Sequence, residues 1–328
     1  MIQAALFAEL QKLCLRSFPE RLGQRISQVE TLASEPSPML GLTLSWRRGH
    51  QPGIERLIVR RYSDRRTWWS LDDPVKAQRE WVVLRWLYGE GIAVPKVYAL
   101  GAEQEPALLL MARSPGRPSA PVQGAGTTVT LQEWHVDALA GLLADLHQPT
   151  PPDAVRQVLP AVTVTEELRR MAVMAEHSRN DGMMEAVDEL NDMLVAENLE
   201  MLPSCVLHGD VRLANVLSDA RGITAILGWE SSAFGDPRWD VACIVNDLNS
   251  YHAEGLADRF CTAYASQAAA APAHLLFWQT LIAVHRWIVG SQMQQRAGGA
   301  LSESEVGLWG ETAWRTLTRL RQAGRSPE

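Results

Sequence analysis

The segment 205–228 constrains the fold of this chain more than any other part of its sequence. Apolar residues at 205–207 and 216–217 flank the stretch 208–215, which mixes polar and apolar residues. This pattern predicts two short buried strands joined by a loop. A loop that is held at both ends keeps the carboxylate of Asp210 and the carboxamide of Asn215 at a fixed separation, which favours a chemical role for both.

The rest of the chain changes from strand patterns to helical patterns. Apolar alternation predicts strands at 26–32, 41–46, 56–62, 96–100 and 107–111. The turn-rich residues 47–53 are expected to join two of them. A helical pattern covers 74–88, and the first ten residues predict an amphipathic helix. Further helices are predicted at 131–147, 165–176, 183–200, 237–249, 254–267, 274–294 and 303–322.

These patterns predict an α+β architecture with two lobes. Residues 1–112 are expected to form an N-terminal lobe with an antiparallel sheet. Residues 113–130, of which 114–129 are rich in Pro, Gly, Ser and Ala, are expected to form a hinge and linker. Residues 131–328 are expected to form a larger helical lobe that carries the loop 208–215.

Composition excludes several classes of function. The net charge of -7 argues against general binding to nucleic acid or to anionic membranes, and permits a cationic or neutral ligand. No apolar run reaches membrane-spanning length, and the N-terminus has no basic leader. The four cysteines have no metal-ligand spacing and lie among apolar residues. Free thiols in a reducing compartment, and hence a cytoplasmic protein, are expected.

The loop itself suggests a reaction. Asp210 has the chemistry to accept the proton of an attacking hydroxyl, and Asn215 has the chemistry to bind magnesium through its side-chain oxygen. His208 and Gly209 are expected to shape the turn. A purely structural alternative is that Asp210 caps a turn and Asn215 takes a left-handed backbone conformation.

The loop resembles the catalytic loop of the aminoglycoside phosphotransferase and choline kinase-like family, relatives of the protein kinases. The resemblance continues at 57–60, 78–81, 94–97, 110–116, 143–147 and 235–237, and at Asp240. It implies a bilobal protein kinase-like fold. It also implies transfer of the γ-phosphate of ATP or GTP to a hydroxyl group of a small molecule, with Mg²⁺ as cofactor. Asp210 would then be the catalytic base and Asn215 a metal ligand.

The resemblance also assigns residues to the nucleotide. Strand alternation lets either Arg60 or Arg61 face the cleft, and the resemblance favours Arg60 for the α- and β-phosphates. Glu80 would orient that arginine through an ion pair, although such a pair is also common on a surface. Residues from Met111 to Arg113 would meet the adenine edge, mainly through backbone groups, and Met111 would form one wall. Asp240 would bind the backbone of the loop from below.

Two features depart from the family pattern. Gly228 replaces the aspartate that chelates magnesium in the family, so a weakened metal site is expected. Glu230 is expected on the same strand-like face, too far along to replace it. The hairpin residues 34–40 contain two prolines and no glycine, which is unfavourable for covering phosphates. The alternative function is therefore a catalytically impaired pseudokinase that binds a ligand or a partner protein.

Overall fold

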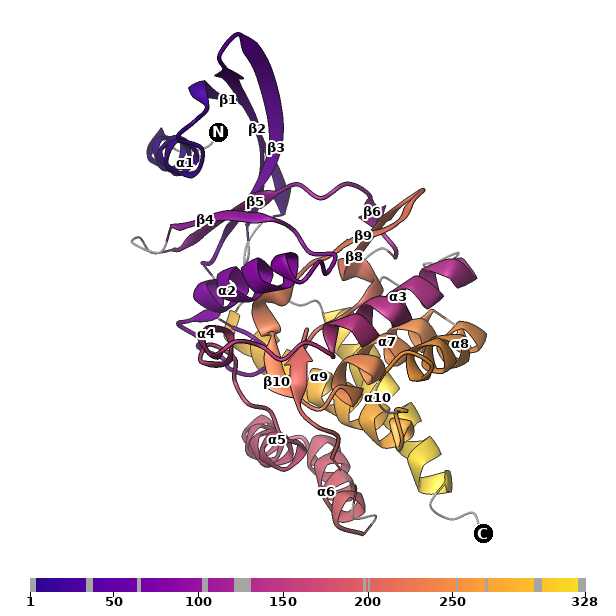
Figure 1. The fold of residues 1–328 in the computed structure, drawn as a ribbon. Helices are drawn as coiled ribbons and strands as arrows, with labels where there is room; N and C mark the ends of the chain where they lie inside the picture. The colour runs from indigo at the N-terminus through magenta and orange to yellow at the C-terminus, as the bar shows by residue number, and fades with distance from the viewer. Residues whose placement is uncertain are drawn as a thin grey trace.

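An antiparallel sheet of five strands, in the order β1-β2-β3-β5-β4, forms the N-terminal part of the structure (Figure 1). Its strands are β1 (Leu22–Ala33), β2 (Met39–Arg48), β3 (Gln51–Arg61), β4 (Val97–Gly101) and β5 (Leu108–Ala112). The computed structural model describes residues 4–33, 38–63, 66–101, 106–120, 131–196, 199, 201–251, 253–268, 271–297 and 303–323. Most of the proline-rich hairpin at 34–40 therefore lies outside the described residues.

The two faces of the sheet pack against different partners because successive side chains of a strand point to opposite faces. Leu57 and Val59 of β3 are fully buried in a cluster with residues of helix α1 (Ala4–Ser17). Ile58 faces the other way and pairs in register with Met111 of β5, which joins the core that includes helix α2 (Lys76–Gly89). Arg60, two residues from Ile58, shares this inner face.

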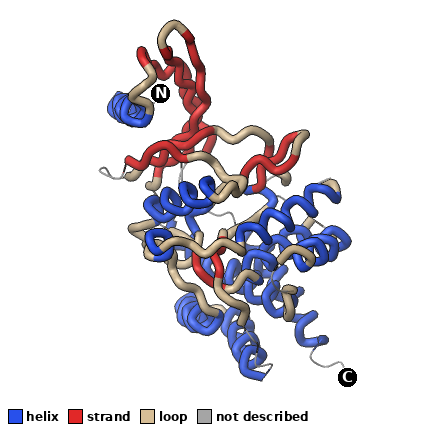
Figure 2. The backbone as a smooth tube through the Cα atoms, in the orientation of Figure 1, coloured by secondary structure: helices blue, strands red, loops and turns tan. Residues whose placement is uncertain are grey.

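Helices dominate the C-terminal part, and the remaining strands are short (Figure 2). The helices are α3 (Glu133–Leu146), α4 (Asp153–Arg156), α5 (Val164–Ser178), α6 (Asp181–Ala196), α7 (Arg238–Ser250), α8 (Glu254–Ala265), α9 (Leu275–Ala297) and α10 (Glu303–Ala323). The strands are β6 (Arg117–Pro118), β7 (Cys205–Leu207), β8 (Val216–Asp219), β9 (Gly222–Ile226) and β10 (Ala233–Gly235). The predicted strand–loop–strand unit is thus β7, the loop and β8.

The predicted α+β bilobal fold is confirmed, with local corrections. Strand β3 begins at Gln51, so most of the turn predicted at 47–53 belongs to the paired strands. Gly53 permits this, because a Cβ there would lie 2.3 Å from the ring of Trp46. Strand β6 lies inside the stretch predicted as an irregular linker, where it pairs with β8; the linker residues 121–130 lie outside the described residues.

Among the helices in the described ranges, none combines the length and apolar character needed to cross a membrane.

Candidate active site

Helix α7 supports the loop after β7 from below. The carboxylate of Asp240, which is fully buried, accepts the backbone N–H of His208 at 2.7 Å and that of Gly209 at 3.0 Å. His147 lies 3.3 Å from the same carboxylate. The contact expected of Asp240 is therefore present. Two charge-assisted hydrogen bonds from one side chain fix the backbone immediately before Asp210.

His208 and Gly209 set the shape of the turn. Nε2 of His208 donates to the carbonyl of Leu227 at 2.8 Å, and Nδ1 accepts the N–H of Asp210 at 3.2 Å, which is the pattern of a neutral ring. Gly209 has φ of +83°, and a Cβ there would lie 2.0 Å from the carbonyl oxygen of Ser231. Only glycine fits such a close approach in this conformation.

Asp210 and Asn215 lie together at the end of this turn. The Asp210 carboxylate lies 3.1 Å from Arg286 and 3.2 Å from Arg212, and the residue is only 9% exposed. Nδ2 of Asn215 donates to the Asp210 carbonyl at 3.1 Å. Asn215 ends the short helix η1 (Leu213–Asn215) and does not have positive φ, so the left-handed alternative for this residue is wrong. Its Oδ1 atom is the side-chain oxygen with which Asn215 would bind a metal ion.

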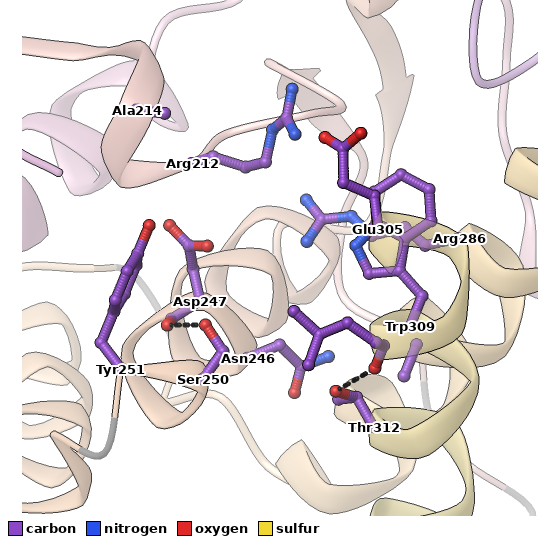
Figure 3. A pocket seen from close by; sticks show the side chains of 12 residues that line it. Arg212, Ala214, Asn246, Asp247, Ser250, Tyr251, Arg286, Glu305, Trp309 and Thr312 are labelled. Atoms are coloured by element: carbon purple, nitrogen blue, oxygen red, sulfur yellow. Dashed lines mark hydrogen bonds between the residues drawn. The ribbon is translucent and has the colours of Figure 1, made fainter. Parts of the chain in front are cut away.

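A pocket opens between the loop, α7, α9 and α10, and its lining includes Arg212 and Arg286, the two arginines that contact Asp210. It encloses about 590 Å³ of empty space, part of it open solvent. Figure 3 shows the guanidinium groups of Arg212 and Arg286 and the carboxylates of Asp247 and Glu305 directed into this space. Trp309 contributes an aromatic wall. The pocket has the size and mixed lining of a site for a small polar molecule.

Sequence reasoning missed Asp247. Its carboxylate accepts the N–H of Leu213 at 2.7 Å and so supports the far side of the loop. Burial raises the pKa of Asp247, against the effect of that hydrogen bond. The available signal was its spacing of seven residues from Asp240, which places both carboxylates on one face of a helix.

Arg60 lies at the centre of a second polar group, on the inner face of the sheet. Its Nη1 atom contacts both carboxylate oxygens of Glu80, at 3.0 and 3.2 Å, so the expected ion pair is present. The hydroxyl of Tyr62 donates to Glu80 at 2.5 Å. A further carboxylate, that of Glu230, accepts from Nη1 at 2.7 Å and from Nη2 at 2.5 Å.

The charges of this group influence one another strongly. Burial lowers the pKa of Arg60, but Glu230 and Glu80 raise it more. Burial raises the pKa of Glu80. Burial also raises the pKa of Glu230, but the charge of Arg60 outweighs this effect and lowers the pKa of that carboxyl well below its usual range. Arg60 therefore favours the charged form of Glu230.

Comparison with known proteins identifies the family. A model of the phosphotransferase enzyme family matches residues 43–278, more than half of the chain. The chain belongs to this family. It is therefore a small-molecule phosphotransferase, and the predicted membership of the aminoglycoside phosphotransferase and choline kinase-like family is confirmed. No curated protein matches the chain significantly.

Solved structures share the fold over nearly the whole chain. A protein of Ralstonia eutropha JMP134, provisionally assigned as an aminoglycoside phosphotransferase, has a TM-score of 0.67 and 17% identity, covering 95% of this chain and 98% of its own. Choline kinase LicA from Streptococcus pneumoniae has a TM-score of 0.61 and 14% identity, covering 96% and 99%. The streptomycin–ATP–APH(2'')-IIa ternary complex has a TM-score of 0.58 and 16% identity, covering 95% and 96%.

The backbone after β9 corrects the position predicted for Glu230. Gly228 is left-handed, with φ 83° and ψ 46°, and the short helix η2 (Trp229–Ser231) follows it. The chain therefore leaves the strand direction at Gly228, and the prediction that Glu230 lies farther along the same strand face is wrong. The glycine directly after an apolar strand was the available signal for this turn.

The residues near Asn215 do not fit a magnesium ion held by the protein. A Cβ at position 228 would lie 3.1 Å from Nδ2 and 3.6 Å from Oδ1 of Asn215, so Gly228 does face the carboxamide. It brings no ligand atom there. Within the described ranges, no three or more Asp, Glu, His or Cys side chains come together as a metal site. One carboxamide oxygen falls short of the carboxylates that magnesium usually requires.

A wide groove lies on the inner side of the sheet, where the nucleotide is expected. It is lined by Gln28, Glu30, Thr43, Ile54, Arg56 and residues 113–117. Met111 is buried on the same face. The side chain of Arg113 forms an ion pair with Glu30, and its N–H donates to the carbonyl of Arg56 at 3.1 Å. This N–H is therefore engaged, so the backbone contact expected of Arg113 would use other groups.

Proposed function

We propose that this protein transfers the γ-phosphate of ATP or GTP to a hydroxyl group of a small molecule, with Asp210 as the base. The arrangement of Asp210 carries the proposal. Its carboxylate is held between Arg212 and Arg286, which line the pocket, at the end of a turn that Asp240 fixes through two backbone N–H groups. Catalysis by positioning needs such a rigid arrangement.

The acceptor would enter the pocket with its hydroxyl directed at Asp210. The carboxylate would accept the hydroxyl proton as the oxygen attacks the γ-phosphorus, and the nucleoside diphosphate would leave. Arg212 and Arg286 would hold the carboxylate in place. Both of those arginines contact Asp210. The carboxylates of Asp247 and Glu305 in the pocket would therefore favour a cationic or neutral acceptor.

The nucleotide would occupy the groove on the inner face of the sheet. The solved ternary complex of streptomycin, ATP and a protein of the same fold supports a nucleotide as the phosphate donor. Met111 would line the base and Arg113 the groove's edge, while Arg60, oriented by Glu80, would face the phosphates. Asn215 is the side chain proposed to contact a metal ion, and its single carboxamide oxygen is an incomplete donor set for Mg²⁺.

The cell compartment is part of the same proposal. All four cysteines are free, and three of them, Cys14, Cys205 and Cys243, are buried. Burial raises the pKa of Cys14 to about 11. Buried, protonated thiols without disulfides are typical of a reducing compartment, so we place the protein in the cytoplasm.

Phosphate transfer by the wild type and by Asp210→Asn tests the proposal. The assay would follow radiolabelled γ-phosphate from ATP or GTP to a panel that includes streptomycin and choline. Loss of a general base is expected to lower the rate by a factor of ~10²–10⁴. Asp258→Asn, the same change at an exposed position, is the matched control. Transfer by Asp210→Asn at the wild-type rate would exclude Asp210 as the base.

Gly228 and the engaged Arg60 favour a second function, that of a pseudokinase. In this case the protein would bind a ligand or a partner protein in the cleft without efficient transfer. The same assay separates the two functions. Transfer by the wild type at ordinary kinase rates of ~1–100 s⁻¹ would exclude the pseudokinase. Nucleotide binding without transfer to any member of the panel would favour it.

A further inference from the structure

We propose that Glu230 occupies the phosphate-binding side of Arg60, so that a nucleotide must displace Glu230 before its phosphates reach the guanidinium. The inference rests on the proposed nucleotide site and adds a residue that controls its affinity. Glu230 is thus an internal competitor of the nucleotide for Arg60. The observations that carry it are the contacts of Arg60, the difference between its two carboxylate partners and the local charge.

The terminal nitrogens of Arg60 are both engaged. Nη2 donates to Glu230 at 2.5 Å, while Nη1 is shared between Glu230 at 2.7 Å and Glu80 at 3.0 Å. The contact to Glu230 is therefore the two-pronged one that a guanidinium makes to a carboxylate or a phosphate. The remaining Nε atom is buried and has no hydrogen-bond partner. A phosphate oxygen can obtain a comparable contact with Nη1 and Nη2 only if a carboxylate leaves.

Glu230 is the partner that can leave. The side chain of Glu80 is 3% exposed, lies on helix α2 and also accepts the hydroxyl of Tyr62. The side chain of Glu230 is 23% exposed and lies on the single turn η2 after left-handed Gly228. Arg79 donates to the backbone carbonyl of Glu230 at 3.1 Å, so the backbone is held and a change of side-chain rotamer is sufficient.

The local charge explains why this competition matters. The carboxylates of Glu80 and Glu230 already balance the charge of Arg60, so an approaching phosphate does not meet an unpaired guanidinium there. In a complete metal site a cation would offset the charge of the phosphate, but Gly228 supplies no ligand. When Glu230 is displaced, the Nη atoms of Arg60 can bind phosphate, and Glu80 still orients the guanidinium. The affinity for nucleotide therefore depends on the charge of Glu230.

Calorimetric titration of the full chain with ATP and with GTP, each with and without MgCl₂, tests the inference. Glu230→Gln keeps the shape of the side chain and removes its charge. It is expected to bind nucleotide about 10-fold more tightly or better than the wild type, since close charge pairs couple by at least that much. The gain is expected with and without MgCl₂. Glu166→Gln removes an exposed glutamate that also contacts an arginine and is expected to change nothing.

A second variant and a second measurement protect the test against misfolding. Glu230→Asp keeps the charge but shortens the side chain, and we expect an affinity between those of the wild type and Glu230→Gln. In the wild type, saturating ATP is expected to shift the side-chain carboxyl NMR signal of Glu230, because its contact to Arg60 is lost while the backbone stays held. An unchanged Glu230 carboxyl signal in the nucleotide-bound wild type would contradict displacement.

The remaining outcomes separate this inference from the proposed function. Equal nucleotide affinity in the wild type and Glu230→Gln overturns the competition and leaves the nucleotide site intact. Weaker binding by Glu230→Gln only when MgCl₂ is present also overturns it, since Glu230 would then act on the metal. Absence of nucleotide binding in every variant overturns the inference together with the proposed nucleotide site.

Discussion

At the scale of single residues, the backbone conformation of Gly228 determines which side chains face Arg60 and Asn215 in the cleft. Its left-handed conformation turns the chain into η2 and brings Glu230 to Arg60. The same glycine faces the carboxamide of Asn215 without offering a ligand. Gly228 therefore leaves the expected metal site without a carboxylate ligand, and its backbone conformation brings the carboxylate of Glu230 to Arg60.

Restoring a carboxylate at this position gives the first prediction. Gly228→Asp is expected to strengthen nucleotide binding in the presence of Mg²⁺, because Asn215 would gain a ligand beside it, and to give no gain without the metal, because the added charge repels phosphate. The φ of +83° costs ~1–2 kcal/mol of stability, and the Asn215 amide must shift slightly. Titration calorimetry with and without MgCl₂ measures the effect.

Gly228→Asn is the matched control, because asparagine tolerates the left-handed conformation and brings no charge. It is expected to carry the same strain without the full gain in metal dependence. Equal magnesium dependence in the wild type and Gly228→Asp would show that position 228 does not face the metal.

At the scale of elements, a buried polar contact joins α5 to α9. Glu167 of α5 lies 3.0 Å from His285 of α9 and also accepts from Arg170. Burial favours the neutral form of Glu167, but His285 and Arg170 lower the pKa of this carboxyl to about 2. Burial lowers the pKa of His285 itself. The carboxylate therefore stays charged far into the acid range.

This pKa predicts a pH dependence of stability. A carboxyl whose pKa is depressed on folding contributes stability above its unfolded pKa of 4.5, and that contribution is lost as pH falls toward about 2. The shift corresponds to a contribution of ~3 kcal/mol. Urea unfolding of the wild type and Glu167→Gln between pH 3 and 7 measures it, and the variant is expected to lose less stability on acidification.

Glu166→Gln serves as the control, because Glu166 is exposed and pairs with Arg169 at the surface. It is expected to follow the wild type at every pH. If Glu167→Gln loses as much stability as the wild type between pH 5 and 3, Glu167 is not the group that titrates.

At the scale of the whole molecule, one core crosses from the sheet to the helices. Leu84 of α2 and Met111 of β5 belong to the same buried cluster as Leu207 of β7 and Ile244 of α7. Arg60 of β3 adds a polar link to η2. The sheet is therefore not expected to unfold independently of the helical part.

Scanning calorimetry is expected to show one unfolding transition. Leu84→Ala removes buried contacts at the junction and is expected to lower stability by ~2–5 kcal/mol, shifting the whole transition. Leu15→Ala changes an exposed leucine of α1 and should shift it little. Two separate transitions in the wild type, or a shift of only part of the transition in Leu84→Ala, would contradict a shared core.

Local sequence determined much of this molecule. Apolar periodicity predicted the strand-rich and helical parts, and the fixed spacing of Asp210 and Asn215 predicted the loop. The pairing of Arg60 with Glu80 followed from strand and helix positions together with the family resemblance. These features are encoded within short stretches or in the spacing of neighbouring elements.

Tertiary structure alone decided the partners across the cleft. Arg60 and Glu230 are 170 residues apart, and their contact depends on the left-handed turn at Gly228 and on how the sheet packs against the helices. Likewise, the N–H of Arg113 bonds to Arg56 because β3 and β5 pair in that register. Periodicity specifies which face of an element is buried, but the pairing of polar groups between elements depends on their relative placement, which packing of the whole chain sets.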